Sequence, residues 1–168
     1  VHGFKRRSSS ANTERVDHLF DSVNFNNKSF FIHYGDISDG TSTLNIINKV
    51  KPDEIYNLAA QSHVAVSFVI PNYTASVDAL GCLNILEAIR LSSRVDDIKF
   101  YQASSSEMFG KSFTLQSTDS SVGDSLVTHE TTTTHKYQDE DTAFMPQSPY
   151  AIAKLAAHHL VRNYRDSY

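Results

Sequence analysis

The chain has 168 residues and a formal net charge of −4, with 40% hydrophobic and 20% charged residues. These values are ordinary for one soluble globular domain with its own core. The slight acidic excess argues against a dedicated nucleic-acid or membrane-surface binder, and no apolar run approaches the length needed to span a bilayer. A single cysteine, Cys82, cannot form an internal disulfide, which makes a reducing, cytoplasmic setting the simplest interpretation.

Strand and helix signals alternate along the chain. Apolar segments predict strands at residues 1–5, 29–36, 54–60 and 97–104. Helices are predicted from the cap Asp39 to about Val50, over residues 73–91, and from the cap Ser148 with Pro149 in the first turn. This alternation is typical of an α/β fold in which helices cover a parallel sheet.

Polar residues follow three of the predicted strands. Asp36, residues 59–62 and residues 104–107 all lie where a strand has just ended. Parallel sheets of this class bind ligands beyond the carboxyl ends of their strands. We therefore expect a binding site at this edge of the sheet.

Residues 111–143 differ in composition from the rest. Serine and threonine dominate, Thr131–Thr134 is an uninterrupted threonine run, and three acidic residues occupy 139–141. We expect a solvated loop without regular structure. The alternative is a lid that becomes ordered over a ligand.

Tyr150 and Lys154 are four residues apart in a predicted helix and therefore share one face. A lysine ammonium near a phenol lowers the pKa of the phenol, which makes a tyrosine usable as a general base. The pattern is short, and an amphipathic helix whose tyrosine and lysine are unrelated produces it as well.

Two further segments could carry chemistry. Glu107, at the ligand-facing end of a predicted strand, could move protons, or it could be an acid at a helix start that faces solvent. Arg6 and Arg7, followed by serines, suit a phosphate because guanidinium groups bind it bidentately, although an ordinary basic turn looks the same. Cys82 and the histidines lack the spacing of a metal site, so we expect no metal.

Longer segments carry more information than these short patterns. They include RRSSS (6–10), HYGDISD (33–39), NLAAQSHV (57–64), KFYQASSSEMFGK (99–111) and PQSPYAIAK (146–154). Together they resemble the sugar-nucleotide branch of the extended short-chain dehydrogenase/reductase superfamily, and within it the GDP-mannose 4,6-dehydratase family. The resemblance covers nearly everything outside residues 111–143. It implies a Rossmann-like doubly wound parallel sheet, NADP as cofactor, GDP-mannose as substrate, and a homo-oligomer, dimer or tetramer, at full length.

The resemblance implies cofactor contacts by position. The segment for the 2′-phosphate of NADP matches Arg6, Arg7, Ser8 and Ser9, and the adenine contact matches Asp36 and Ile37. The loop along the pyrophosphate and nicotinamide matches Leu58, Ala59, Ala60, Gln61 and Ser62, and Tyr73 and Lys154 are further cofactor contacts.

The catalytic set implied by the resemblance is Ser105, Glu107, Tyr150 and Lys154. In the mechanism that the resemblance implies, Tyr150, assisted by Lys154, takes the proton of the mannose C4 hydroxyl while a hydride passes to NADP, and Ser105 hydrogen-bonds that oxygen. The family usually has threonine at this place. Glu107 removes the C5 proton and helps expel the C6 hydroxyl as water before the hydride returns to C6. The product is GDP-4-keto-6-deoxymannose, a precursor of GDP-fucose or other deoxysugars.

Two expected parts of the family are not among these residues. The glycine-rich GxxGxxG turn does not occur, and neither does the carboxyl-terminal substrate region. With the strand order 3-2-1-4-5, a missing first strand leaves a gap in the middle of the sheet and two unpaired edges. We therefore expect a partial sheet, and an inactive fragment that forms no 4-keto product by itself.

Alternative interpretations stay open. A UDP-glucuronate decarboxylase or a nucleotide-sugar epimerase would share the Tyr150–Lys154 pair and the cofactor. Glu107 disfavours an epimerase, which removes no C5 proton, and the RRSSS segment favours NADP. A non-catalytic binding or oligomerisation remnant would keep the fold without the activity.

Overall fold

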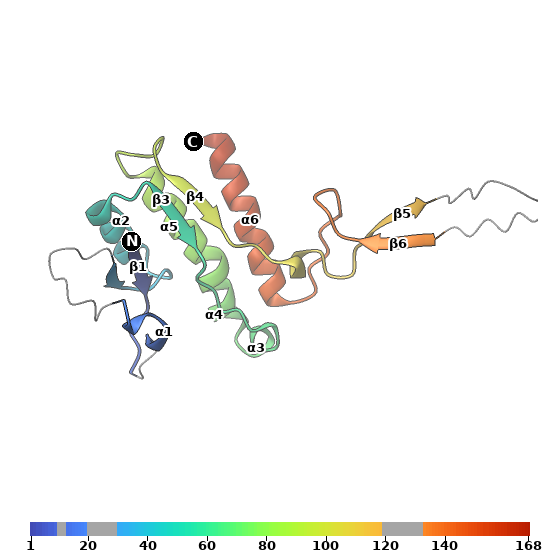
Figure 1. The fold of residues 1–168 in the computed structure, drawn as a ribbon, viewed down its shortest axis with the longest axis horizontal. Coiled ribbons are helices and arrows are strands. Elements are labelled where there is room, and N and C mark those ends of the chain that lie inside the picture. Colours follow the sequence, from blue (N-terminus) through green and yellow to red (C-terminus); the bar gives the residue numbers. More distant parts are fainter. Residues whose placement is uncertain (10–12, 20–29, 119–132) are drawn as a thin grey trace, which may run out of the picture.

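The computed structural model describes residues 1–9, 13–19, 30–118 and 133–168 (Figure 1). The strands are β1 (His2–Lys5), β2 (Phe31–Tyr34), β3 (Glu54–Asn57), β4 (Lys99–Gln102), β5 (Thr114–Thr118) and β6 (Thr133–Tyr137). The helices are α1 (Glu14–Asp17), α2 (Gly40–Val50), α3 (Val64–Val69), α4 (Pro71–Ala75), α5 (Gly81–Arg90) and α6 (Pro149–Ser167). A π-helical turn, η1 (Ser76–Leu80), joins α4 to α5, and a 3₁₀ turn, η2 (Ser106–Met108), follows β4. The predicted alternation of strands and helices is confirmed.

Four strands form two parallel pairs. β1 pairs with β2, and β3 pairs with β4, each through four residues in register. Within the described residues no hydrogen bonds join the two pairs, so β1 and β3 each keep an open edge. The expected partial sheet with an interruption is confirmed, and its open edges carry backbone groups that a further strand could pair with.

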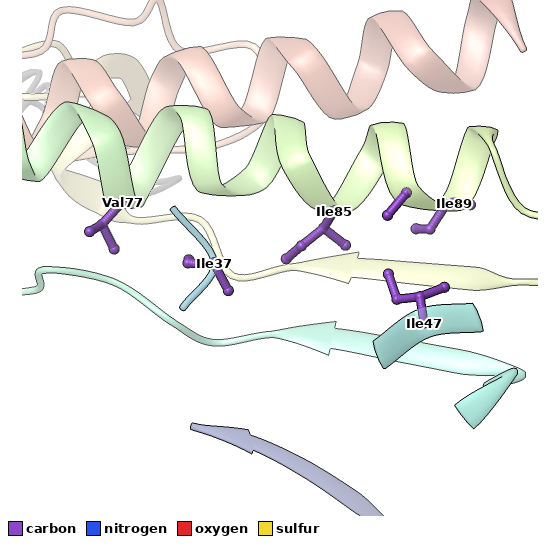
Figure 2. Close-up of a cluster of buried hydrophobic side chains, with 6 residues drawn as sticks. Ile37, Ile47, Val77, Ile85 and Ile89 are labelled. Atoms are coloured by element: carbon purple, nitrogen blue, oxygen red, sulfur yellow. The ribbon is translucent and has the colours of Figure 1, made fainter. Parts of the chain in front are cut away.

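The helices form a layer with α5 in its middle. α5 contacts α2 on one side and α6 on the other. Figure 2 shows α5 running along the strands β3 and β4, and α6 also contacts β4. Alternate residues of β3 and β4 are exposed, among them Tyr56 and Tyr101, because successive side chains of a strand point to opposite faces.

One hydrophobic cluster underlies both strand pairs. Its buried members are Ile37, Ile47, Val77, Ile85, Ala88 and Ile89 (Figure 2). Phe4 of β1, Ile55 of β3 and Phe100 of β4 pack against it. The two strand pairs are therefore held together by shared apolar packing rather than by backbone hydrogen bonds.

Two helix starts are capped as predicted. The Asp39 carboxylate accepts the Thr41 N–H at 3.0 Å at the start of α2. The Ser148 hydroxyl accepts the Ala151 N–H at 3.1 Å, and Pro149 is the first residue of α6. Each cap satisfies an amide that has no partner inside its helix.

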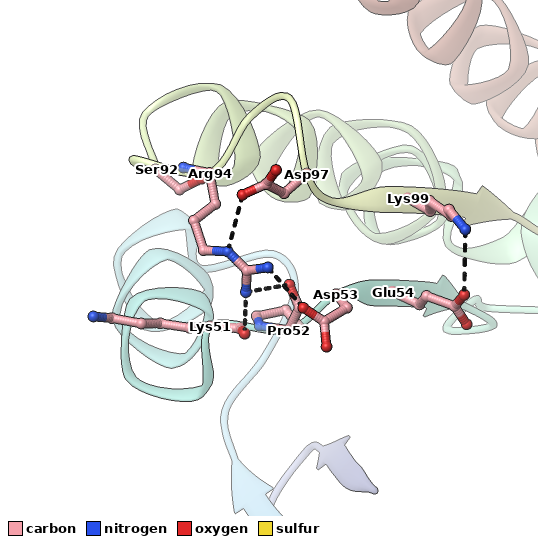
Figure 3. Close-up of polar contacts among 8 residues, drawn as sticks. All are labelled: Lys51, Pro52, Asp53, Glu54, Ser92, Arg94, Asp97 and Lys99. Atoms are coloured by element: carbon pink, nitrogen blue, oxygen red, sulfur yellow. Dashed lines mark hydrogen bonds and ion pairs between the residues drawn. The ribbon is translucent and has the colours of Figure 1, made fainter.

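A cluster of polar contacts around Arg94 lies at the amino ends of β3 and β4 (Figure 3). The guanidinium donates to the carbonyl oxygens of Lys51 and Pro52, at 2.6 and 3.3 Å, just beyond the end of α2. It also pairs with Asp53 at 2.6 Å and with Asp97 at 3.4 Å. Carbonyls at a helix end lack intrahelical partners, so Arg94 ties α2 to this end of the sheet.

The expectation of an irregular loop after residue 111 is wrong for ten residues. β5 and β6 pair antiparallel, from Thr114 opposite Tyr137 to Thr118 opposite Thr133. Threonine is β-branched and fits a pleated strand well, which explains why a threonine-rich segment pairs here. Figure 1 shows this hairpin pointing away from the helix layer, and residues 119–132 lie outside the described part.

The helical region after β3 is more broken than predicted. Helix α3 is not predicted, because its sequence VAVSFV is rich in β-branched residues that favour strands. The predicted helix 73–91 begins at Pro71 instead and contains the π-helical turn η1. Single π-helical turns of this kind occur mostly inside α-helices and frequently at functional sites. In the described part of the chain, no helix is long and apolar enough to cross a membrane.

We predict that Ile85→Ala lowers the free energy of unfolding by about 2–5 kcal/mol, because a buried aliphatic side chain is lost and a cavity remains. Ile85 is 5% exposed within the cluster that joins the two strand pairs. Urea unfolding followed by circular dichroism measures the change. Ile152→Ala is the matched control, since Ile152 is 58% exposed, and equal losses in both variants would contradict the shared-core interpretation.

Candidate active site

Helix α6 meets the end of β4 through one buried lysine. The ammonium of Lys154 donates to the carbonyl oxygen of Ala103, the residue directly after β4, at 2.9 Å. Lys154 is only 3% exposed, and its ammonium lies 5.9 Å from the ring centroid of Tyr150, itself 8% exposed. The two residues thus share a buried helix face and interact, which an amphipathic helix with an unrelated pair would not require.

Ser105 and Glu107 lie in the turn that follows β4. The Ser105 hydroxyl accepts the backbone N–H of Glu107 at 3.2 Å and so caps η2. Met108 is buried and anchors the turn, whereas Glu107 is exposed. A carboxylate held in this way is accessible to a ligand above the strand end.

Electrostatics at Lys154 are set by burial and by one carboxylate. Burial lowers the pKa of the Lys154 ammonium, and the charge of Asp78 opposes this effect, with a smaller opposing contribution from Cys82. Burial also raises the pKa of the Cys82 thiol to about 12, so the thiol is neutral near pH 7. Asp78 is therefore the charge that favours the protonated lysine at neutral pH.

The predicted cofactor loop after β3 is held in place through two of its backbone amides. The N–H of Gln61 donates to the Asp78 carboxylate at 2.7 Å, and the N–H of Ala59 donates to the side chain of Asn57 at 3.2 Å. Leu58 and Ser62 are exposed, and Ala60 is half-buried. The loop thus lies at the carboxyl end of β3, fixed at two amides and open to solvent on its other side.

The predicted phosphate segment lies after β1. The Arg6 guanidinium donates to the Tyr73 hydroxyl at 2.9 Å, which brings together two predicted cofactor residues that are 67 positions apart. The Arg7 guanidinium lies 4.6 Å from the ring centroid of Tyr34. Ser8 and Ser9 are exposed.

Asp36 and Ile37 follow β2. The Asp36 carboxylate accepts the N–H and the hydroxyl of Ser38, at 3.0 and 2.7 Å, and these hydrogen bonds lower its pKa, with a smaller contribution from Arg6. The Ile37 side chain belongs to the hydrophobic cluster, and its carbonyl accepts from Asn84 at 2.8 Å. A ligand contact by Ile37 would therefore involve its main chain.

Sequence reasoning missed three groups at this site. The Ala103 carbonyl is a backbone atom and carries no sequence signal. Tyr34 is identified only by its contact with Arg7. Asp78 had a weak signal, because an acid stands beside Val77 and Cys82 on the apolar side of a helix. Among the described residues, no cluster of metal-ligating side chains exists, and the expected absence of a metal stays a prediction.

The model of the GDP-mannose 4,6 dehydratase family matches residues 1–125 and 128–168. The chain belongs to this family. Curated relatives agree with the match along the whole chain. A GDP-mannose 4,6-dehydratase of Vibrio cholerae is 50% identical over 168 residues, and GDP-mannose 4,6 dehydratase 1 of Arabidopsis thaliana is 48% identical over 172. Both alignments cover 100% of this chain but only 40% and 41% of those relatives.

Solved structures with this fold include enzymes whose names give other sugar nucleotides. A dTDP-glucose 4,6-dehydratase of Bacillus anthracis in complex with NAD has a TM-score of 0.66 at 23% identity, over 99% of this chain and 42% of that one. A UDP-glucose 4-epimerase of Thermus thermophilus in complex with NAD has a TM-score of 0.62 at 26% identity, over 84% of this chain and 39% of that one. The predicted Rossmann-like fold is confirmed as a partial one.

We predict that Gly110→Ala destabilises the turn that carries Glu107. Gly110 has φ +55°, and an added Cβ would lie 2.0 Å from the Met145 carbonyl oxygen. Strain of this kind costs about 1–3 kcal/mol for the backbone alone, before the clash is counted. In Gly3→Ala, the control, the new Cβ meets its nearest atom at 3.5 Å. In urea unfolding, the midpoint of Gly110→Ala should lie clearly below that of Gly3→Ala, and equal midpoints would refute the prediction.

Proposed function

We propose that this chain is the cofactor-binding and catalytic part of a GDP-mannose 4,6-dehydratase, a lyase that forms GDP-4-keto-6-deoxymannose. The observation that carries the proposal is the buried Lys154, held on the Ala103 carbonyl beside Tyr150 at the strand end that leads to Glu107. Family membership supports the choice of substrate. A cytoplasmic setting and a homo-oligomeric whole enzyme belong to the same proposal.

A nicotinamide cofactor fits the residues present. Two similar structures are complexes with NAD. In this chain Arg6 and Arg7 are exposed at the end of β1, where they would hold the extra phosphate of NADP. The Gln61 loop and Lys154 would line the path from the pyrophosphate to the nicotinamide. When bound, NADP would accept a hydride from the sugar and later return it.

The chain's own residues would perform the proton transfers. Tyr150, as phenolate, removes the proton of the C4 hydroxyl, and the Lys154 ammonium stabilises the phenolate. Ser105 donates a hydrogen bond to the C4 oxygen. The resulting 4-keto group acidifies C5, so Glu107 can take the C5 proton and deliver it to the departing C6 hydroxyl. Water leaves, and Glu107 ends ionised as it began. When the hydride returned to C6, C5 would take up a proton, for which the neutral Tyr150 is the available donor, so Tyr150 would also end as phenolate.

Glu107 also helps to distinguish between the candidate activities. An epimerase at C4 removes no C5 proton, so the exposed Glu107 would have no catalytic role in it. A UDP-glucuronate decarboxylase shares the sequence pattern at this strand end. The choice of the dehydratase over the decarboxylase therefore depends on the family match.

The test uses a hybrid protein in which residues 1–168 replace the matched stretch of the Vibrio cholerae relative, since the chain covers 40% of that enzyme. The hybrid should convert GDP-mannose to the 4-keto product, detected by mass spectrometry. Within it, Glu107→Gln should lower kcat by at least about 100-fold, the range of general acid–base catalysis, with cofactor affinity unchanged. Full activity of this variant would remove the role of Glu107.

Glu54→Gln is the matched control for that prediction. Glu54 lies at the amino end of β3, opposite the site, where it faces Lys99 at 4.0 Å. Its variant should keep the activity of the hybrid. If the folded hybrid binds cofactor but does not consume GDP-mannose, the proposed substrate is wrong.

A second prediction concerns the choice between NADP and NAD. Arg7→Ala should weaken NADPH binding by about 10–100-fold and NADH binding far less, because a charge-assisted bond to the extra phosphate is lost. Fluorescence titration of the hybrid measures both affinities. Arg165→Ala is the control, since Arg165 lies exposed at the far end of α6. Equal loss for both cofactors would show that Arg7 does not bind that phosphate.

A further inference from the structure

Asp78 is a buried acid for which the proposed reaction has no use so far. It is 2% exposed and belongs to the π-helical turn η1 between α4 and α5. Among the described residues, its Oδ2 atom is buried without a hydrogen-bond partner. A buried carboxylate is costly unless charges or hydrogen bonds compensate it, so its surroundings indicate what it does.

One side of Asp78 holds the cofactor loop. Oδ1 accepts the N–H of Gln61 at 2.7 Å. The Gln61 side chain in turn accepts the hydroxyl of Thr74 at 3.1 Å, and Thr74 is fully buried. The segment from α4 to η1 therefore holds Gln61 by hydrogen bonds to both the backbone and the side chain of Gln61.

The η1 turn that carries Asp78 packs against α6, the helix that carries the buried Lys154, and Asp78 Oδ2 is buried there without a hydrogen-bond partner among the described residues. Burial raises the pKa of the Asp78 carboxyl, and the hydrogen bond from Gln61 and, to a smaller extent, the charge of Lys154 oppose this rise. Burial lowers the pKa of the Lys154 ammonium, and the charge of Asp78 is the largest opposing contribution. Among the described residues, the other titratable groups at Lys154 are Cys82 of α5 and Tyr150 of α6. The Cys82 thiol is neutral near pH 7, so it cannot replace the carboxylate as the compensating charge.

We propose that Asp78 is a positioning residue for the reaction proposed above: its carboxylate fixes Gln61 and supplies the negative charge that balances Lys154. One side chain thereby links the loop for the cofactor to the Tyr150–Lys154 pair. The inference rests on the proposed function, but the pairing of Asp78 with Lys154 can be tested apart from it.

The first experiment measures the pH dependence of kcat/KM for GDP-mannose in the hybrid protein. Asp78→Asn keeps the shape of the side chain and an oxygen for Gln61, but removes the charge. Lys154 should then lose its proton at lower pH, so the alkaline limb moves down by about one to two pH units, as expected for the loss of one close charge. NADPH affinity should stay within about threefold of the parent.

Two further variants separate positioning from a structural role. Asp78→Ala removes the acceptor as well, so NADPH affinity should fall in addition to the shift of the limb. Asp97→Asn, an exposed aspartate at the other end of the sheet, should change neither quantity. An Asp78→Asn variant whose activity falls equally at every pH, or does not change, would overturn the proposal.

The second experiment needs no activity. Lys154→Met leaves the Asp78 charge buried without compensation, so adding Asp78→Asn should raise the urea midpoint of the 168-residue chain and of the hybrid. Asp97→Asn added to Lys154→Met should leave the midpoint unchanged. If the losses of unfolding free energy caused by Asp78→Asn and Lys154→Met simply add up, the two charges do not interact and the pairing is refuted. If the two substitutions are coupled in stability but every hybrid is inactive, only the proposed function is refuted.

Discussion

The structure depends on one hydrophobic cluster that two separate strand pairs share. β1–β2 and β3–β4 are not hydrogen-bonded to each other among the described residues, yet Phe4 from one pair and Ile55 from the other pack against the same buried cluster, which includes isoleucines of α2 and α5. Burial of apolar surface is non-directional and needs no strand between them. The packing of α5 thus decides how the strand ends that carry the candidate site lie relative to one another.

Charge burial is the second constraint, and it is concentrated at the site. Lys154 and Asp78 are both almost fully buried, which is rare for charged residues unless they are paired. Their mutual stabilisation and the hydrogen bonds to Ala103 and Gln61 offset the cost of removing them from water. Helices that needed only to cover the sheet would have apolar side chains at these two positions, one in η1 and one in α6, so the proposed chemistry of the site is the better explanation of their presence.

Sequence patterns predicted the main elements correctly where the signal was local. The caps Asp39 and Ser148 and the strand at residues 97–104 depend on neighbouring residues, and the structure has all three. Predictions failed where distant contacts compete with local preference. The valine-rich α3 forms a helix packed against α6, and the threonine-rich segment at β5 finds a partner strand that its composition alone did not reveal.

The sequence by itself determined the alternation of strands and helices, the shared face of Tyr150 and Lys154, and, through its longer segments, the family. These follow from periodicity and local hydrogen bonding, which act over a few residues. Only the tertiary structure decided that Lys154 is buried on the carbonyl of Ala103, 51 positions away, on a helix that packs against the turn carrying Asp78. Burial and electrostatic partners come from segments distant in the chain, so no local pattern encodes them.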